Sequence, residues 1–220
     1  MQLKKIILAY RHTLQILLLG IFSFLVNYHY GFIGIMPMDN TVLYNGGYRI
    51  LSGYVPFTDY WLVTGPLLDY LNAFFFYVFG VSWKTFIIHS SLFNVLIALA
   101  SYFLFNEIGL SKKNSLLYSS LISVLFYPIV GTPFVDHHST FFLIIAFYLF
   151  ILSVNSKKYS YLFFVPFMFC LSFLSKQTPA AYGIIGILPL IFLLCFYEQK
   201  SIKKILFFLI AGSIGAIFFL

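Results

Sequence analysis

Residues 179–197 read PAAYGIIGILPLIFLLCFY, a run without a single charged side chain. A helix of about 20 such residues, each rising about 1.5 Å, crosses the hydrocarbon core of a bilayer. A soluble domain carries about 25% charged residues, whereas this chain of 220 residues is 9% charged and 61% hydrophobic. A soluble fold of this length would expose too much apolar surface to water. The sequence therefore predicts an integral membrane protein.

Similar apolar runs recur along the chain and predict an all-α, polytopic bundle of transmembrane helices. We expect about seven spans, near residues 14–36, 83–105, 115–131, 138–154, 160–175, 179–197 and 204–220. The last run reaches the chain end, where a polar tail would normally follow a span. We therefore expect residues 1–220 to form a single transmembrane domain that is incomplete at its C-terminus.

Basic residues alternate along the chain with these apolar runs, which is typical of the positive-inside rule. With a cytoplasmic N-terminus, ten basic residues fall in cytoplasmic segments and three fall outside. The cytoplasmic set is Lys4, Lys5, Arg11, Lys112, Lys113, Lys157, Lys158, Lys200, Lys203 and Lys204, and the outside set is Arg49, Lys84 and Lys176. The net charge of +7 thus reflects topology, and we expect no nucleic-acid partner. The predicted location is the inner (cytoplasmic) membrane, crossed several times.

The same topology sorts the acidic residues in the opposite sense. Four of them fall outside, namely Asp39, Asp59, Asp69 and Asp136, while Glu107 and Glu198 fall inside. His137 and His138 also fall outside. The candidate reactive groups therefore collect on the extracytoplasmic side of the predicted bundle.

The segment between the first two spans is long and half apolar. Asp39 is a favoured N-cap for a helix that would end at Gly53. Pro66 is favoured at the first position of a second helix, which would end at Gly80. Both helices are too short and too polar to cross a membrane, so we expect two helices lying in the outer interface.

These elements resemble the N-terminal half of the GT-C glycosyltransferases, and above all the branch that uses polyprenyl-phosphate sugars. That branch includes the protein O-mannosyltransferases and the aminoarabinose transferases. The likeness covers residues 1–220 and is carried by Met38-Asp39-Asn40, RILSGYVPFTDY at 49–60, Gly65-Pro66, Val135-Asp136-His137-His138 and Lys176-Gln177-Thr178-Pro179. The family often has a second acidic residue directly after the first, and this chain has Asn40 there.

The resemblance implies transfer of a sugar from a lipid phosphate to an acceptor at the membrane face. The acceptor, a protein, lipid or polysaccharide, loses a proton, and a carboxylate can take it; cations stabilise the departing phosphate. Asp39 is the candidate catalytic base. The candidate substrate-binding residues are Asp59, Arg49, Asp136, His137, His138, Lys176 and Gln177. The implied partners are a lipid-linked sugar donor and the bilayer, and we expect neither a cofactor nor a metal.

Each of these residues also has a purely structural interpretation. Asp39 can serve as a helix cap, Asp59 as a turn carboxylate and Lys176 as a lysine that reaches for lipid headgroups. At the level of the whole chain, the alternatives are a transporter or flippase for a lipid-linked or small anionic substrate, and a structural subunit of a membrane complex. Transporters usually carry repeated halves with broken helices, and the sequence contains no internal repeat.

Overall fold

The computed structural model describes residues 2–34 and 36–219, and this part of the chain has an all-α fold, as predicted. The α-helices are α1 (Gln2–Tyr30), α2 (Pro37–Leu51), α3 (Leu67–Phe79), α4 (Trp83–Glu107), α5 (Lys112–Leu125), α6 (Val135–Ser156), α7 (Phe164–Ser175), α8 (Gln177–Tyr197) and α9 (Ile202–Phe219). Three 3-10 turns are η1 (Tyr127–Ile129), η2 (Tyr159–Phe163) and η3 (Gln199–Ser201). The chain forms two compact units: unit 1 is Met1–Asn40 with Val81–Pro133, and unit 2 is Thr41–Gly80 with Phe134–Leu220.

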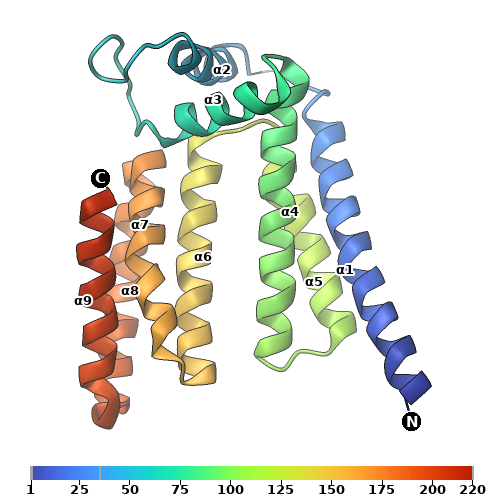
Figure 1. Cartoon of the computed structure of the whole chain (residues 1–220), viewed down its shortest axis with the longest axis vertical. Coiled ribbons are helices and arrows are strands. Elements are labelled where there is room, and N and C mark those ends of the chain that lie inside the picture. Colours follow the sequence, from blue (N-terminus) through green and yellow to red (C-terminus); the bar gives the residue numbers. More distant parts are fainter. Residues whose placement is uncertain (1, 35, 220) are drawn as a thin grey trace. The chain divides into compact units, whose positions relative to one another are not determined.

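Unit 1 is a bundle of α1, α4 and α5 held by buried polar contacts as well as by apolar packing (Figure 1). The amide of Asn94 on α4 donates to the carbonyl oxygens of Ser23 on α1 and Ser123 on α5, each at 2.9 Å. Ser115, Ser119 and Ser123 recur every four residues on α5 and are all buried. Small side chains at this spacing let helices approach closely in a membrane.

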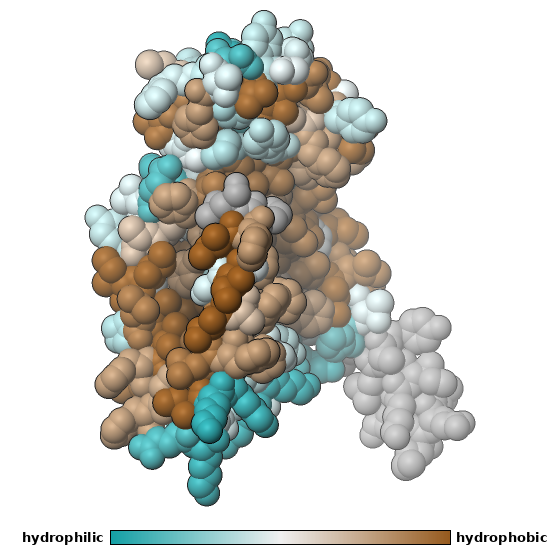
Figure 2. Space-filling model, turned by 60° about the vertical axis from the view of Figure 1, so that its left-hand side comes forward, coloured by the Kyte–Doolittle hydropathy of each residue, from teal (hydrophilic) through white to brown (hydrophobic). Residues whose placement is uncertain are grey.

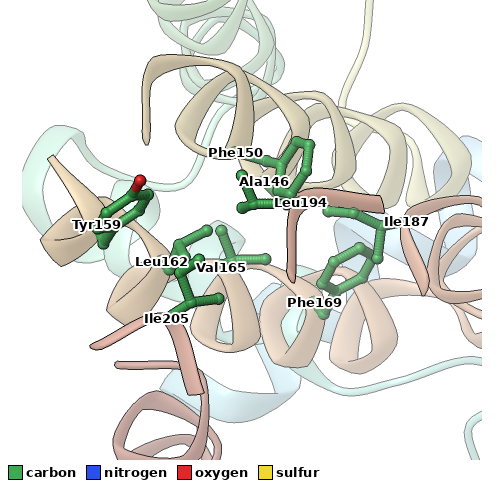
Figure 3. Packing of buried hydrophobic residues seen from close by; sticks show 9 residues of the cluster. All are labelled: Ala146, Phe150, Tyr159, Leu162, Val165, Phe169, Ile187, Leu194 and Ile205. Carbon is green, nitrogen blue, oxygen red and sulfur yellow. The ribbon is translucent and has the colours of Figure 1, made fainter. Parts of the chain in front are cut away.

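The core of unit 2 lies between α6, α7, α8 and α9. Figure 3 shows nine buried side chains from these helices and from η2 converging in one cluster. They are Ala146, Phe150, Tyr159, Leu162, Val165, Phe169, Ile187, Leu194 and Ile205. Because lipid is as apolar as these side chains, close van der Waals packing rather than exclusion of water holds the helices together.

The charged residues of unit 2 separate to its two ends. Lys157, after α6, lies 3.7 Å from Glu198, after α8, so these two connections share one end. The other lysines of these connections and of the start of α9 are Lys158, Lys200, Lys203 and Lys204. Figure 2 shows mostly hydrophobic side chains along the sides of the helices and hydrophilic ones gathered at the lower end of the view. The alternating helix directions are thus confirmed within unit 2, while the orientation in the membrane remains a prediction.

Each of the seven predicted spans contains a helix, the first ending at Tyr30, but within the described residues five helices are long and apolar enough to cross a membrane. These are His12–Tyr30, Trp83–Glu107, Val135–Ser156, Gln177–Tyr197 and Gln199–Phe218. The predicted span at 115–131 is shorter because α5 ends at Leu125, before Pro128 in η1. Proline cannot donate the backbone hydrogen bond that would continue the helix. The predicted span at 160–175 begins as the 3-10 turn η2 and becomes α-helical only in α7.

The two short helices predicted between the first spans are present as α2 and α3. The predicted N-cap was wrong: α2 begins at Pro37, so Asp39 lies inside its first turn. Proline is tolerated there because the first turn leaves its backbone N–H groups unbonded. A carboxylate in the first turn is also favoured by the helix dipole. α3 follows Pro66 and ends before Gly80, close to the predicted bounds.

The C-terminal end of α2 forms at Gly53, as the sequence predicted. The N–H of Gly53 donates to Ile50 O and the N–H of Tyr54 donates to Arg49 O, both at 3.0 Å. This pair of bonds is the Schellman motif, which needs a residue with positive φ, and Gly53 has φ +89°. The motif fixes the direction in which the chain leaves α2.

The loop after α2 is anchored to the bundle of unit 2 at Gly65. The backbone of Gly65 lies directly against the carbonyl group of Leu174 on α7, and a Cβ at this position would overlap that carbonyl. α3, which follows this contact, begins near the end of α7 and contacts it (Figure 1). A glycine is therefore required where the loop joins the bundle.

We expect Gly65→Ala to destabilise the protein by roughly 1–3 kcal/mol, because neither backbone can move without loss of helix packing. Thermal unfolding of the purified protein in detergent measures this change. Gly186→Ala on α8 is the matched control, since a Cβ there makes only an ordinary contact with Phe147. Equal unfolding temperatures for the two variants would contradict the assigned contact.

Candidate functional site

A polar pocket of about 330 Å³ lies in unit 2 at the C-terminal end of α2 and the loop that follows it. Its lining residues are Asn45, Tyr48, Arg49, Ser52, Tyr54, Asp59 and Tyr60. Two predicted substrate-binding residues, Arg49 and Asp59, are thus brought together here. Clefts with a few convergent polar groups are the usual form of a ligand site.

Asp59 also has a structural task in this loop. Its Oδ2 accepts the backbone N–H of Val55 at 2.7 Å, and its own N–H donates to Val55 O at 2.9 Å. The turn is tightened further by Phe57, whose φ of 65° lies in the left-handed region. Such a conformation is uncommon for a residue other than glycine and often occurs at functional sites. The turn interpretation of Asp59 and its place in the pocket are therefore compatible.

A chain of three side chains supports one wall of the pocket. The guanidinium carbon of Arg49 lies 5.0 Å from the centre of the Tyr60 ring, within the range of a cation–π contact. The Tyr60 hydroxyl donates to Asp69 Oδ2 at 2.9 Å. Arg49 forms no ion pair among the described residues, so its charge stays available to a ligand.

Asp69 was predicted to lie on the extracytoplasmic side but not to belong to the site. It is 3% exposed, and Gly46 of α2 lies so close that a Cβ there would overlap its carboxylate. Burial raises the pKa of Asp69 from its usual 3.8 to about 6, against the opposing effects of the Tyr60 hydrogen bond and of Arg49. The sequence signal that could have revealed this buried acid is a single carboxylate within a short apolar helix, together with the Gly46-Gly47 pair in the preceding helix.

A second cluster lies in unit 2 where α6 and α8 begin. Lys176 Nζ donates to both carboxylate oxygens of Asp136, at 2.7 and 2.8 Å. Ser139 Oγ donates to Lys176 O at 3.0 Å and approaches Ser172 Oγ at 2.9 Å. These contacts hold the start of α8 against α6. Two further predicted site residues, 40 positions apart in the sequence, are therefore adjacent in space.

The histidines beside Asp136 are placed differently from each other. His138 is fully buried, and its Nδ1 lies 3.1 Å from Phe134 O. The His137 ring makes an edge contact with Phe134, with ring centres 6.0 Å apart. Gln177 is exposed as the first residue of α8. Of this predicted group, Asp136, Lys176 and Gln177 can meet a ligand directly, while His138 faces the interior of unit 2.

Asp39 differs from the other three acids that were predicted to lie outside. Its side chain is exposed, and no hydrogen bond or ion pair joins it to the described residues. The next residue, Asn40, is buried and accepts the hydroxyl of Thr132 at 3.0 Å. Asn40 therefore anchors this turn of α2 within unit 1 and leaves a single free carboxylate beside it.

Comparison with known protein families gives a match over more than half of the chain. The family described as dolichyl-phosphate-mannose-protein mannosyltransferase matches residues 63–220. The matched part includes Asp69, Asp136 and Lys176 and begins after Asp39 and the polar pocket. No curated protein and no solved structure matches the chain.

The buried carboxyl of Asp69 predicts a pH-dependent stability. The pKa of Asp69 in the folded protein lies above its usual value. The protonated carboxyl therefore makes its full contribution to the free energy of unfolding below about pH 4. This contribution is lost as the pH rises to about 6, a change of roughly 3 kcal/mol. Thermal unfolding in detergent from about pH 4 to about pH 8 should show this loss, and Asp69→Asn, which keeps an acceptor for Tyr60, should remove it. Parallel pH curves for the two proteins would exclude Asp69 as the cause.

Proposed function

Given that the chain belongs to the dolichyl-phosphate-mannose-protein mannosyltransferase family, we propose that it transfers a sugar from a polyprenyl-phosphate carrier to an acceptor on the extracytoplasmic face. Membership makes it a membrane glycosyltransferase of the GT-C type, and its apolar helices make it a multi-pass membrane protein. Family membership leaves open the donor, the side of the membrane and the residues that act, which are proposed below.

The proposed reaction is a displacement at the anomeric carbon of the donor sugar. The acceptor hydroxyl oxygen forms a bond to this carbon while the bond from the carbon to the phosphate oxygen breaks. The bonding electrons leave with the polyprenyl phosphate, and the acceptor proton passes to a carboxylate. The protein therefore needs an unoccupied base for the proton and a cation for the phosphate.

Asp39 is the proposed base, and the observation that carries this choice is that its carboxylate is uncommitted. Among the outer acids, Asp59 accepts a backbone N–H, Asp69 accepts the Tyr60 hydroxyl and Asp136 holds Lys176. Asp39 alone has no partner within the described residues. It is also exposed, in the first turn of a helix, so a substrate hydroxyl can approach it.

Lys176 is the proposed cation for the donor phosphate. It stands at the N-terminus of α8, where unbonded backbone N–H groups and the helix dipole add partial positive charge. Such helix ends bind phosphate well. Asp136 keeps the ammonium at this end of the helix until the phosphate arrives. His137 and His138 would support the start of α6, and Gln177 would contact the donor headgroup.

Asp39→Asn should lower the transfer rate by about 10²–10⁴-fold, because the amide cannot accept the proton. The assay follows sugar transfer from a synthetic polyprenyl-phosphate sugar in membranes that contain the full-length protein. Glu107→Gln, at the end of α4, is the control and should leave the rate unchanged. An unchanged rate in Asp39→Asn would rule out Asp39 as the base. Absence of any transfer by the unsubstituted protein would instead favour transport or a structural role.

Lys176→Gln should raise the KM for the lipid-linked donor about tenfold or more, since the phosphate loses its charged partner. Lys176→Arg, which keeps the positive charge, should restore most of the affinity. Initial rates at varied donor concentration give both values. A donor KM that does not respond to either substitution would show that Lys176 serves only its ion pair with Asp136.

A further inference from the structure

The pocket at the end of α2 is built before any ligand arrives. The Schellman motif at Gly53 fixes the backbone between the lining residues Ser52 and Tyr54. The turn from Val55 to Asp59 fixes the position of Asp59. The hydrogen bond from Tyr60 to the buried Asp69 holds the ring against which Arg49 lies. A site whose side chains are already ordered loses less conformational entropy when it binds.

The electrostatics of this pocket do not suit a phosphate. Arg49 is the single cation among its lining residues, and the carboxylate of Asp59 lies in the same lining. The buried Asp69 adds a second acid behind Tyr60. An anion would therefore meet repulsion as well as attraction, whereas a neutral ligand with many hydroxyl groups would meet none.

The side chains do suit a sugar ring. Sugars present apolar C–H faces that pack on aromatic rings, and Tyr48, Tyr54 and Tyr60 line the pocket. The hydroxyl groups of a sugar both donate and accept hydrogen bonds. The carboxylate of Asp59, the amide of Asn45 and the guanidinium of Arg49 offer matching acceptors and donors. Tyr54 is 53% exposed and so offers its ring to an incoming ligand.

A peptide fits this pocket less well. Peptides are commonly held by backbone bonds to a strand edge or by apolar side chains in a groove. The described lining comes from a helix end and a turn, and it contains no aliphatic side chain. The pocket of about 330 Å³ is also near the lower end of ligand sites, which is suitable for a small unit of a larger molecule.

We infer that this pocket binds a neutral sugar unit of the acceptor, so that the acceptor of the transferase is a glycan. Tyr54 would pack on the sugar face, Asp59 and Asn45 would bond its hydroxyl groups, and Arg49 would donate to its oxygens. This inference rests on the proposed function for the identity of the acceptor, but binding to the pocket can be measured without any transfer.

The test uses the full-length protein in lipid nanodiscs, with maltotriose and mannotriose as neutral probes and a short Ser/Thr peptide for comparison. Saturation-transfer NMR reports weak binding of each probe. We expect a trisaccharide to bind, and Tyr54→Ala and Asp59→Asn each to weaken it about tenfold. Asp59→Asn keeps a side-chain oxygen that can accept the Val55 N–H, so the turn is preserved. Tyr77→Ala on α3, an exposed tyrosine outside the pocket, is the matched control.

Two outcomes would overturn the inference: trisaccharide binding that is unaffected by Tyr54→Ala and Asp59→Asn, or binding of the peptide alone. A transfer assay separates this failure from failure of the proposed function. If sugar still moves from the lipid-linked donor to a peptide or lipid, and the pocket variants transfer normally, the glycan inference fails and the transferase proposal stands. If trisaccharides bind in a pocket-dependent way but Asp39→Asn leaves transfer unchanged, the proposed base fails and the sugar site stands.

Discussion

Water is absent from the hydrocarbon core of a bilayer, so every polar group of a spanning helix needs a partner within the protein. Several buried side chains of the helices meet this need with partners on neighbouring helices in both units, although the Oδ1 atoms of Asn27 and Asn94 have none among the described residues. Asn94 bonds two carbonyl groups on neighbouring helices of unit 1, and Ser139 and Ser172 bond each other between α6 and α7 in unit 2. These contacts set helix positions that apolar packing alone would leave loose, because lipid competes for the same apolar surfaces.

The same constraint confines the chemistry to the ends of the helices. Charged side chains are costly inside lipid, and the acids that the topology places outside lie at helix starts or in the loop after α2. Most of these acids already have partners: Asp59 closes a turn, Asp69 holds Tyr60 and Asp136 holds Lys176. Because these three acids are bound to other groups, Asp39 is the free carboxylate among the described residues. Asp39 is therefore the proposed base, and the other acids are proposed to support the structure.

The two proposed binding sites within unit 2 differ in their chemistry. The start of α8 combines a lysine with a helix N-terminus, which suits the phosphate of a lipid carrier. The pocket after α2 combines tyrosines with mixed charges, which suits an uncharged, hydroxyl-rich group. The proposed transfer from a lipid-linked donor to a second substrate needs both kinds, and their separate charge types would favour each substrate at its own site.

Much of the fold could be predicted from the sequence, because the determining signals are local. Apolar runs identified the helices, and Gly53 and Gly80 marked the ends of α2 and α3, since composition and glycine act on the chain next to them. The number of full-length spans was less predictable, because the early end of α5 depends on Pro128 and on packing of its serines. The start of α2 differed by three residues, since the helix begins at Pro37 and not after Asp39.

The arrangement of the candidate site was decided by tertiary structure. The sequence identified Asp136 and Lys176 as separate candidates, but their ion pair depends on α6 and α8 starting at the same end of unit 2. The sequence gave no reason to join Arg49, Tyr60 and Asp69, which meet only because Gly46 lets α2 approach Asp69 and because the loop turns back at Asp59. The formation and ends of a helix depend on residues that are adjacent in the sequence. The environment of a side chain depends on which distant segments the fold brings against it.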